Sequence, residues 1–458
     1  MTSTQLVARV LWQRRRLRAR EHWTPDQVAA RQKRALAALR QFAVARSPFY
    51  RRFHAGLESA PLHDLPPLPK AALMDAFDEA VTDRSLRLAD LQAYLADEGS
   101  GERFGRYWVA ATSGSSGRRS IVPTDIGEWA AVIASYARAN EWAGVLPGVR
   151  HRTRMAVVSS TTAWHQSARV AASVRSPLVD STRLDAAAPL VETVARLNEL
   201  RPEVLIGYAS MIRVLAEEQL AGHLRITPRA VNSASEVLSP ASRELAARAW
   251  GMPPFDVYAA TETGGIAAEC AHHTGMHLFE DLVIAEVVDD DYAPVPAGTT
   301  GARLLVTVLS SRTLPLIRFE LTDRVRLSTG TCPCGRPFRL VAGIEGRTDD
   351  VLTLPATGGG TVTVHPVVFH QVLDLVDAAG WQVRQETDGL TVLLASPGDG
   401  LDPSRVGRAV TGALAAAGAA PAVRVPVVDA IPASAAGKRP VVVARRATAR
   451  TAPPTVSN

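Results

Sequence analysis

Strand-length apolar runs alternate with helix-like segments through the middle of the chain, and no other feature restricts the fold as much. The runs are bounded by turn residues and lie at 155–159, 204–206, 230–231 and 255–258. The segments between them carry apolar residues at helical spacing and lie at 189–200, 209–220 and 241–250. This alternation is typical of βαβ units, which place their strands in a mostly parallel sheet. We therefore expect an α/β fold.

The rest of the chain predicts a β-rich subdomain and a second domain. Closely spaced β-like runs between residues 282 and 327 indicate an antiparallel or barrel-like subdomain. Beyond residue 346, shorter strand-like and helical runs indicate a compact α+β domain. We expect a large N-terminal domain at 1–346 and a small, mobile C-terminal domain at 347–458, with a hinge near 347–350 and a disordered tail after about residue 445.

The N-terminal region is predicted to be helical. Thr24 is a suitable N-cap, Pro25 suits the first helical position, and Gln27 can close a capping box. The helix that starts here is expected to end before Ser47, and a further helix is expected at 70–80.

Arginine dominates the basic residues. The 51 Lys and Arg residues against 45 Asp and Glu residues leave a net charge of +6, which invites a nucleic-acid-binding interpretation. Because Lys33, Lys70 and Lys438 are the only lysines, a compositional bias toward arginine explains the excess better. One dense run comprises Arg14, Arg15, Arg16, Arg18 and Arg20. We interpret this run as a solvated or partner-facing helix surface, with nucleic-acid or membrane binding as the alternative.

A glycine- and hydroxyl-rich segment follows a strand-like run. Its residues are Thr112, Ser113, Gly114, Ser115, Ser116 and Gly117. Such a loop lets backbone N–H groups and hydroxyls surround a polyphosphate, because glycine permits close approach and positive φ. It is not a Walker loop, and the alternative interpretation is a flexible surface loop.

Two further segments place polar residues directly after β runs. After the run that ends at Tyr258, Thr261 and Glu262 can offer a hydroxyl to a phosphate and a carboxylate to Mg²⁺. Asp323 ends an apolar run and suits the two hydroxyls of a ribose, and Arg347 follows in a charged glycine turn. Each segment by itself is equally an ordinary helix start or turn.

The fourth segment is a glycine-containing loop near the C-terminus. Lys438 follows Gly437 in the small domain. An ammonium on such a loop can stabilise negative charge in a transition state, while the alternative is a solvated lysine.

These four segments, in this order, resemble the adenylate-forming superfamily of acyl-CoA synthetases and nonribosomal adenylation domains. Within it the chain is most similar to the phenylacetate–CoA ligase group. The resemblance runs from about Ser47 to Lys438 and depends on the four motifs occurring together. It departs from the family pattern at Arg119 and Ser120, where a Pro-Lys pair is usual, and at Ala259, where a glycine is usual.

The resemblance implies a role for each motif residue. The residues 112–117 would form the phosphate loop, and Lys438, Thr261 and Glu262 would be catalytic, with Glu262 holding Mg²⁺. Residues that would bind the ribose or the adenine side of ATP are Asp323, Arg347, Ser235, Glu236 and Tyr258. Asp349 would be the hinge between two domain orientations.

The resemblance also implies a two-step reaction. A carboxylate attacks the α-phosphorus of ATP in the presence of Mg²⁺, which gives an acyl-adenylate and pyrophosphate, and a thiol then displaces AMP. We expect ATP-dependent activation of a small aryl carboxylic acid with CoA as acceptor. One alternative is delivery of the acyl group to a carrier protein or an amine in a biosynthetic pathway, and the non-enzyme alternative is a basic nucleic-acid-binding protein. We expect no nucleic-acid or membrane partner, and a homodimer is an option.

The three cysteines suggest a metal site. An odd, small number of cysteines excludes a disulfide framework, and no secretory or membrane-spanning pattern is visible, so we expect a cytoplasmic protein. Cys270, Cys332, Cys334 and His273 would complete a tetrahedral structural zinc site, with His272 or His277 as alternatives to His273. Some phenylacetate–CoA ligase-like proteins carry a similar cysteine-rich insertion. The alternative is that the three cysteines are reduced, unpaired and bind no metal.

The residues that would line the acid-binding pocket have the weakest support in the sequence. Trp164 and His165 lie about where the superfamily places a substrate-side aromatic residue and histidine, and Tyr136 and Tyr208 can also line the pocket. The alternative for each is an ordinary core position.

Overall fold

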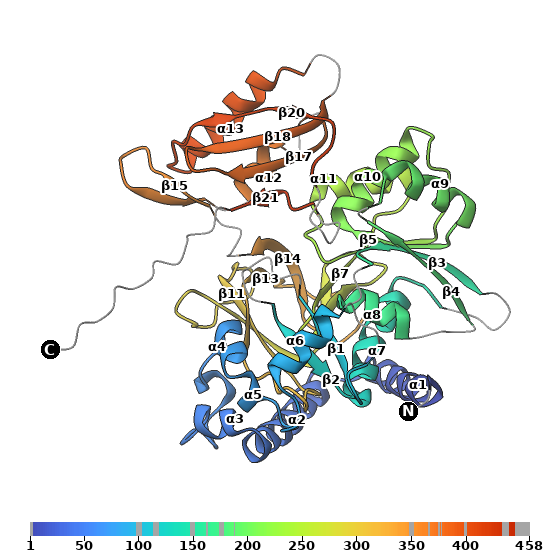
Figure 1. The fold of residues 1–458 in the computed structure, drawn as a ribbon, viewed down its shortest axis with the longest axis vertical. Coiled ribbons are helices and arrows are strands. Elements are labelled where there is room, and N and C mark those ends of the chain that lie inside the picture. The colour runs from blue at the N-terminus through green and yellow to red at the C-terminus, as the bar shows by residue number, and fades with distance from the viewer. Residues whose placement is uncertain are drawn as a thin grey trace. The chain divides into compact units, whose positions relative to one another are not determined.

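The computed structural model describes residues 3–97, 103–112, 119–146, 152–161, 164–173, 178–186, 188–347, 352–364, 367–373, 376, 378–397, 401–432 and 439–444. These residues form two compact units, one built from residues before position 349 and one from residues after it (Figure 1). Each unit has its own hydrophobic core. The expected boundary at 346/347 stays a prediction.

The first unit begins with helices, as the sequence predicts. They are α1 (Ser3–Arg20), α2 (Pro25–Arg46), α3 (Pro48–Phe53), η1 (Leu62–Asp64), α4 (Lys70–Asp75), α5 (Phe77–Ala80) and α6 (Leu88–Ala96). The capping box is confirmed, since the Thr24 side chain accepts from the Gln27 N–H and the Gln27 side chain accepts from the Thr24 N–H. The single helix expected at 70–80 is interrupted at Ala76.

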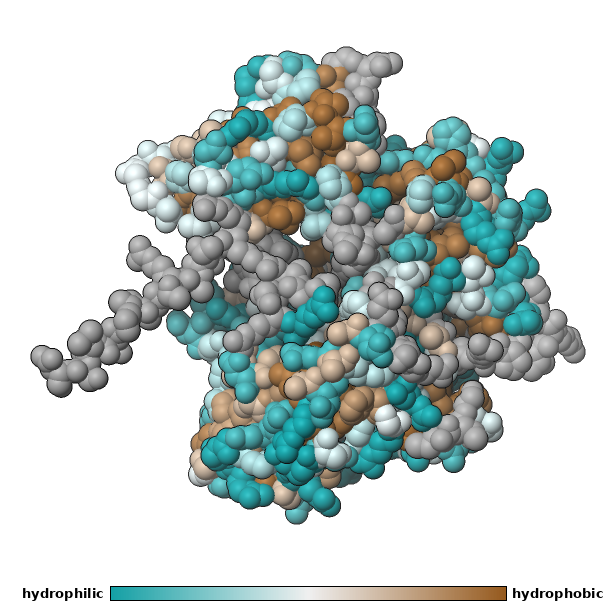
Figure 2. Space-filling view, in the orientation of Figure 1, coloured by the Kyte–Doolittle hydropathy of each residue, from teal (hydrophilic) through white to brown (hydrophobic). Residues whose placement is uncertain are grey.

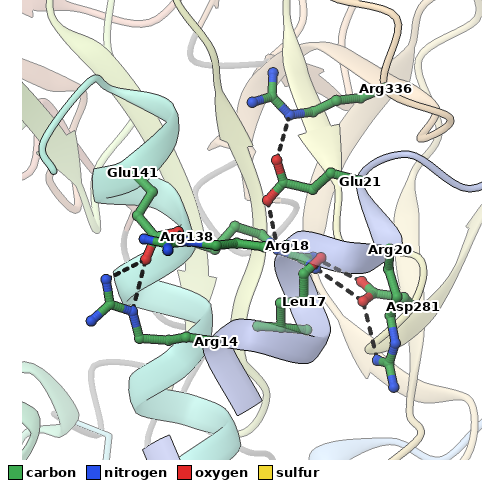
Figure 3. A network of polar contacts seen from close by, with 9 residues as sticks. All are labelled: Arg14, Leu17, Arg18, Arg20, Glu21, Arg138, Glu141, Asp281 and Arg336. Atoms are coloured by element: carbon green, nitrogen blue, oxygen red, sulfur yellow. Dashed lines mark hydrogen bonds and ion pairs between the residues drawn. The ribbon is translucent and has the colours of Figure 1, made fainter. Parts of the chain in front are cut away.

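The arginine run of α1 is held by acidic partners in the first unit (Figure 3). α1 packs against α7 (Ile126–Trp142), and both Arg14 and Arg18 pair with Glu141 of that helix. Arg20, which is only 4% exposed, pairs with the buried Asp281 carboxylate at 3.2 Å. A purely solvated surface is therefore the wrong interpretation for this run, because part of it anchors the helix.

Arg138 of α7 shares the Asp281 carboxylate with Arg20. Its Nη1 lies 2.7 Å from Oδ1 of Asp281, and its Nη2 donates to the Leu17 carbonyl. Although burial alone would raise it, the pKa of Asp281 is lowered by the charges and hydrogen bonds of Arg138 and Arg20. The carboxylate between two guanidinium groups thus fixes the end of α1.

Nine strands form the central sheet. They are β3 (Thr153–Ser159), β4 (Val179–Asp185), β5 (Val204–Tyr208), β6 (Ala230–Ala234), β7 (Phe255–Ala260), β8 (Gly264–Glu269), β9 (Met276–Leu278), β13 (Asp323–Leu327) and β14 (Leu340–Arg347). Their order is β13-β14-β9-β8-β7-β6-β5-β3-β4. The pairings from β4 through β3, β5 and β6 to β7 are parallel, and those from β7 to β13 are antiparallel. The α/β class is confirmed, and the parallel part is the region of alternating runs.

Helices connect the parallel strands. They are α8 (Gln166–Ser173), α9 (Leu190–Leu200), α10 (Ala209–Leu220) and α11 (Pro240–Trp250). Apolar side chains of α9, α10 and α11 pack on the strands in a core that includes Leu197, Ile212, Leu215 and Ala246. This packing fixes the carboxyl ends of the strands, where ligands bind in open α/β sheets.

The β-rich part is smaller than expected. β10 (Val283–Val288), β11 (Arg303–Val308) and β12 (Phe319–Leu321) form a three-stranded antiparallel sheet, and β1 (Trp108–Ala111) pairs with β2 (Ile121–Thr124). The run that contains 325–327 belongs to β13 of the central sheet and not to this subdomain. Its alternating burial pattern matches an edge strand of either sheet, so the sequence alone does not assign it.

The second unit is an α+β domain. Its elements are β15 (Leu352–Pro355), β16 (Thr361–Val364), α12 (Val367–Leu373), β17 (Ala378–Gln385), β18 (Leu390–Pro397), α13 (Pro403–Ala416), β19 (Val423–Arg424), β20 (Val427–Val428) and β21 (Val442–Val443). Its core contains Phe369, Trp381, Leu394 and Leu414. The expected tail after 445 lies outside the described residues.

Hydrophilic and apolar residues are interspersed over the visible face of the molecule (Figure 2). The large apolar side chains that are exposed include Leu11, Trp12, Leu146 and Val191. None of the helices in the described part of the chain is both long and apolar enough to span a membrane.

Candidate active site

The predicted nucleotide residues gather at the carboxyl ends of neighbouring parallel strands. Ser235 follows β6 directly and has a φ of 69°, which turns the chain sharply at the strand end. The Glu236 carboxylate accepts from the Ser210 N–H at the start of α10, 2.9 Å away. Thr261 and Glu262 follow the next strand, β7, and are partly exposed.

A hydrogen bond joins two of the predicted motifs. The Tyr258 hydroxyl of β7 donates to the Asp323 carboxylate of β13 at 2.8 Å, and Asp323 is 8% exposed. Asp323 also faces Arg347 across the antiparallel β13–β14 pair. The two residues expected to bind a ribose are therefore directly opposed in the sheet, and one of them contacts the strand that leads to Thr261.

The stem of the predicted phosphate loop is closed by hydrogen bonds. Thr112 donates its N–H to the Ser120 carbonyl at 3.0 Å, and its Oγ1 accepts from the Ser120 N–H at 2.9 Å. The Lys70 ammonium lies 3.4 Å from the same Thr112 Oγ1. None of the four sequence motifs includes Lys70, although the rarity of lysine in this chain is a signal that points to it.

The predicted pocket residues lie around α7, the start of α8 and the end of β5. Tyr136 of α7 donates its hydroxyl to the Gln166 side chain at 2.7 Å, and burial raises the pKa of this hydroxyl. Trp164 and His165 precede α8, with their rings 6.5 Å apart. Tyr208 ends β5, and its hydroxyl accepts from the Ser160 N–H at 2.8 Å. Both tyrosine hydroxyls are thus engaged within the protein.

A cavity of about 520 Å³, a volume that includes open solvent, reaches the Thr261–Glu262 turn from another side. Its lining includes Glu262, Thr263, Gly265, Val132 and Leu282. Tyr136, Trp164, His165 and Tyr208 are not part of that lining, so it differs from the pocket expected from sequence.

Several predicted site residues lie outside the described residues. They are Ser113, Gly114, Ser115, Ser116, Gly117, Asp349 and Lys438. For Arg347 the backbone is described and the side chain is not.

The cysteines converge on a histidine in the first unit. One ligand atom from each of Cys270, His277, Cys332 and Cys334 lies within 4.8 Å of the other three. The Cys270 and Cys332 sulfurs are 3.5 Å apart, and the Cys334 sulfur lies 3.3 Å from Nε2 of His277. Three thiols and an imidazole at this spacing form a donor set suited to tetrahedral zinc.

The histidine expected at this cluster is corrected. His273 turns away from it: its Nδ1 lies 2.9 Å from the Glu269 carboxylate, and its ring packs on Phe255. His277 stands on β9, next to the strand β8 that leads to Cys270, and is fully buried. The short spacing from Cys270 pointed to His273, but the β8–β9 hairpin returns the later histidine to the cysteines.

Burial is the main cause of the pKa shifts of Cys270 and His277 in this cluster. It raises the pKa of the Cys270 thiol to about 12 and lowers the pKa of the His277 imidazole to about 4. For Cys332, burial acts upward, but hydrogen bonds with Thr274 and Cys334 lower its pKa overall. A neutral imidazole is the form that binds a metal ion.

Known proteins of similar sequence are phenylacetate–CoA ligases. That of Thermus thermophilus is 27% identical over 366 residues, which cover 76% of this chain and 75% of the relative. That of Escherichia coli K12 is 28% identical over 54% of this chain and 56% of the relative. No protein-family model matches the chain.

Solved structures with the same fold are CoA ligases. A 2-hydroxyisobutyryl-CoA ligase in the postadenylation state superposes with a TM-score of 0.72 at 20% identity, over 93% of this chain and 91% of that one. The anthranilate CoA ligase AuaEII in complex with anthranoyl-AMP reaches a TM-score of 0.50 at 16% identity, over 72% and 65%. These structures show the fold, and the sequence relatives agree with the resemblance that the four motifs indicate.

Proposed function

We infer that the chain belongs to the phenylacetate–CoA ligase-like group of adenylate-forming enzymes, and we propose that it is an ATP-dependent, AMP-forming acid–CoA ligase. The observation that carries the proposal is the Tyr258–Asp323 hydrogen bond. It joins the strand before the Thr261–Glu262 turn to the residue that faces Arg347. One end of the sheet thus offers groups suited to a ribose and to an α-phosphate.

The first step is adenylation. A carboxylate oxygen of the acid attacks the α-phosphorus of ATP, the bond to the β-phosphate oxygen breaks, and pyrophosphate leaves. Thr261 would hold the α-phosphate, Asp323 and Arg347 the ribose hydroxyls, and Lys438 would offset the charge that develops on the oxygens. The protein contributes position and charge and forms no covalent bond in this step.

The second step is thioester formation. The sulfur of CoA attacks the acyl carbon of the adenylate, the bond to the phosphate oxygen breaks, and AMP leaves. A hinge at Asp349 between the two steps stays a prediction. A carrier protein or an amine as acceptor stays the alternative, and the cytoplasmic location expected from the sequence fits the use of ATP and CoA.

Glu262 is suited to hold Mg²⁺. Its side chain is partly exposed at the strand end, and no ion pair within the described residues engages its carboxylate. A divalent cation at this position would offset the charge of the phosphates. A carboxylate that is not already neutralised by a cation is the donor that Mg²⁺ requires.

Acid-dependent pyrophosphate exchange tests the function. We expect labelled pyrophosphate to enter ATP only when a suitable acid is present, and CoA to convert the intermediate to a thioester with release of AMP. Lys438→Ala should reduce exchange by about 10²-fold or more, since it removes a charge that acts on the transition state. Lys33→Ala, at an exposed position of α2, is the matched control and should exchange like the wild type. The proposal would be wrong if no aryl or aliphatic acid tried supported pyrophosphate exchange.

The acid is proposed to be a small aryl acid. The support is the set of aromatic residues near α7 and α8 and the similarity to enzymes named for phenylacetate. A panel that pairs phenylacetate and benzoate with aliphatic acids of equal size decides this point, because an aliphatic preference would contradict it.

A structural zinc ion is proposed at Cys270, His277, Cys332 and Cys334. The donor types and their mutual distances support it. Protein purified without chelator should contain about one zinc per chain, and both Cys332→Ser and His277→Ala should lose it. His273→Ala is the control that separates the two histidines and should keep the metal. A metal-free wild type, or metal loss in His273→Ala alone, would contradict the assignment.

A further inference from the structure

Gln166 connects three elements at the candidate active site. It is the first residue of α8 and is 6% exposed. Its Nε2 donates to the Thr261 carbonyl at 2.9 Å, and its Oε1 accepts from the Tyr136 hydroxyl at 2.7 Å. Nothing in the sequence motifs points to this residue, because its contacts lie 30 and 95 positions away in the chain.

The direction of this hydrogen-bond chain is fixed by chemistry. The carbonyl oxygen of Thr261 can only accept, so the NH₂ end of the Gln166 amide must face it. The amide oxygen then faces Tyr136, whose hydroxyl must donate. Burial keeps that hydroxyl protonated, since it raises the pKa of Tyr136. The Thr261 carbonyl therefore fixes the orientation of the amide, because exchanging its two ends would place the amide oxygen against that carbonyl and break the bond.

The residues just before Gln166 contact the stem of the phosphate loop. The Trp164 carbonyl accepts from the N–H of Ala111, the last residue of β1, at 2.9 Å. On the far side of the loop, the guanidinium carbon of Arg119 lies 5.6 Å from the centroid of the Trp164 ring. The segment Trp164–Gln166 thus touches both sides of the loop stem and also the Thr261–Glu262 turn.

We propose that Gln166 is a positioning residue for adenylation, which holds the Thr261–Glu262 peptide in place relative to the stem of the phosphate loop. This inference rests on the proposed function. The amide acts on the backbone of Thr261 and, through it, sets where the Thr261 hydroxyl and the Glu262 carboxylate point. Loss of the amide should lower the rate of the chemical step and raise the Mg²⁺ requirement more than it weakens the binding of the acid.

The first test compares Gln166→Leu with the wild type. Leucine has a similar volume and no polar group, so it leaves the Thr261 carbonyl without its donor. We expect kcat of pyrophosphate exchange to fall by about 10- to 100-fold, the range typical for supporting residues around a cation site, with a higher KM for Mg·ATP and a nearly unchanged KM for the acid. Gln32→Leu is the matched control, because the Gln32 amide also donates to backbone carbonyls, those of Glu280 and Val283, and not to the Thr261 carbonyl. It should lower the melting temperature and leave the kinetics unchanged.

The second test uses pH. In Gln166→Glu, a protonated carboxyl can donate its O–H to the Thr261 carbonyl and accept from Tyr136, whereas the carboxylate would face that carbonyl with a negative charge. The activity of Gln166→Glu relative to the wild type should therefore rise as the pH falls. A residue that only stabilises the fold would give a ratio that follows the folded fraction, which circular dichroism measures at each pH.

Each outcome separates this inference from the proposed function. If the wild type exchanges pyrophosphate and folded Gln166→Leu matches its kcat and KM within twofold, the positioning role is wrong and the function stands. If none of the acids supports pyrophosphate exchange by the wild type, the proposed function is wrong. Calorimetry of Mg²⁺-dependent ATP binding then decides the inference about Gln166. ATP binding that requires a higher Mg²⁺ concentration in Gln166→Leu than in the wild type then supports the role. Equal binding in both proteins, or no ATP binding in the wild type, overturns it.

Discussion

At the scale of single residues, the candidate site depends on side chains whose partners lie far away in sequence. Tyr258 and Asp323 are 65 positions apart, and their hydrogen bond places a hydroxyl donor on a carboxylate that is 8% exposed. A hydrogen bond to a charged group contributes about 1.5–3 kcal/mol. The orientation of Asp323 should therefore be sensitive to the loss of one oxygen atom.

We predict that Tyr258→Phe weakens ATP binding. The variant keeps the ring in the core and removes only the donor to Asp323, so KM for ATP should rise about tenfold, with a smaller change in kcat. Steady-state pyrophosphate exchange at varied ATP measures both values. Tyr292→Phe is the control, because it breaks a similar bond to the Glu320 carboxylate in the β-rich part. An equal rise in KM for both variants would contradict a specific role for Tyr258.

We also predict a contribution of Lys70 to phosphate binding. Its ammonium lies 3.4 Å from Thr112 Oγ1, in a chain whose loop has Arg119 and Ser120 where the family usually has Pro-Lys. Lys70→Met keeps the length of the side chain and removes the charge, so ATP affinity should fall about tenfold and its salt dependence should weaken. Titration calorimetry at two salt concentrations measures this, and Lys33→Met should bind ATP like the wild type.

At the scale of elements, α1 is tied to the first unit by buried charges. Asp281 is fully buried between Arg138 and Arg20, while apolar residues of α1 pack with those of α7. Removing one member of a buried ion network leaves the others charged and without a partner in a poorly solvated place. The helix should therefore depend on this carboxylate.

We predict that Asp281→Asn destabilises the first unit by about 3–5 kcal/mol, because Arg20 and Arg138 would remain charged without a counterion. Denaturant unfolding measures the loss, and limited proteolysis should cut near the end of α1 earlier than in the wild type. Glu199→Gln breaks the exposed Arg196–Glu199 pair and should cost no more than about 0.5 kcal/mol. Equal costs for the two variants would argue against the anchoring role.

Most elements could be predicted where local signals agree with burial. The bounds of α10 match the helix expected at 209–220, β10 and β11 lie within the β-like stretch expected between residues 282 and 327, and the Thr24 capping box starts α2 at the expected position. β8 carries no strand signal in the sequence, because it consists largely of glycine and other small residues. It is buried because residues from elsewhere in the chain cover it, with Phe279 and Ser135 close to Gly265. Such strands are fixed by neighbours distant in the chain.

At the scale of the whole molecule, the order of motifs carried the functional prediction. Thr112, Thr261 and Asp323 are far apart in sequence and are recognised only together. The sequence could not predict Gln166, Lys70 or the choice of His277, since each depends on which strands and helices become neighbours. The hydrogen bond between Gln166 and Thr261 spans 95 residues, and no local pattern encodes it.

We predict that His54 makes a destabilising contribution to the first unit in mild acid. His54 is 2% exposed, neither ring nitrogen has a hydrogen-bond partner among the described residues, and burial with the charge of Arg40 lowers its pKa from 6.5 to about 4. Between these values this histidine binds more protons in the unfolded chain than in the folded one, so its contribution to the free energy of unfolding falls as the pH drops from about 6.5 to 4. The full effect is at most roughly 3 kcal/mol.

His54→Phe should remove this contribution and lose less stability than the wild type as the pH falls, because the phenyl ring can pack on Tyr50 and Phe53 and does not titrate. Denaturant melts at half-unit steps of pH measure the slope. His63→Phe, at an exposed position, should leave it as in the wild type. An unchanged slope in His54→Phe would contradict the assignment.

The pairing of Arg20 with Asp281 also has a consequence for synthesis. The two residues are 261 positions apart, so at about 5–20 residues per second the arginine leaves the ribosome roughly 13–52 s before its carboxylate partner. Throughout that interval Arg20 is without the carboxylate that later neutralises it, whereas Glu141, the partner of Arg14 and Arg18, is made earlier. The end of α1 is therefore fixed by this pair only after residue 281 has been made, and a delay in translation before that residue would prolong the exposure of Arg20 to anionic surfaces, the ribosome's own RNA among them.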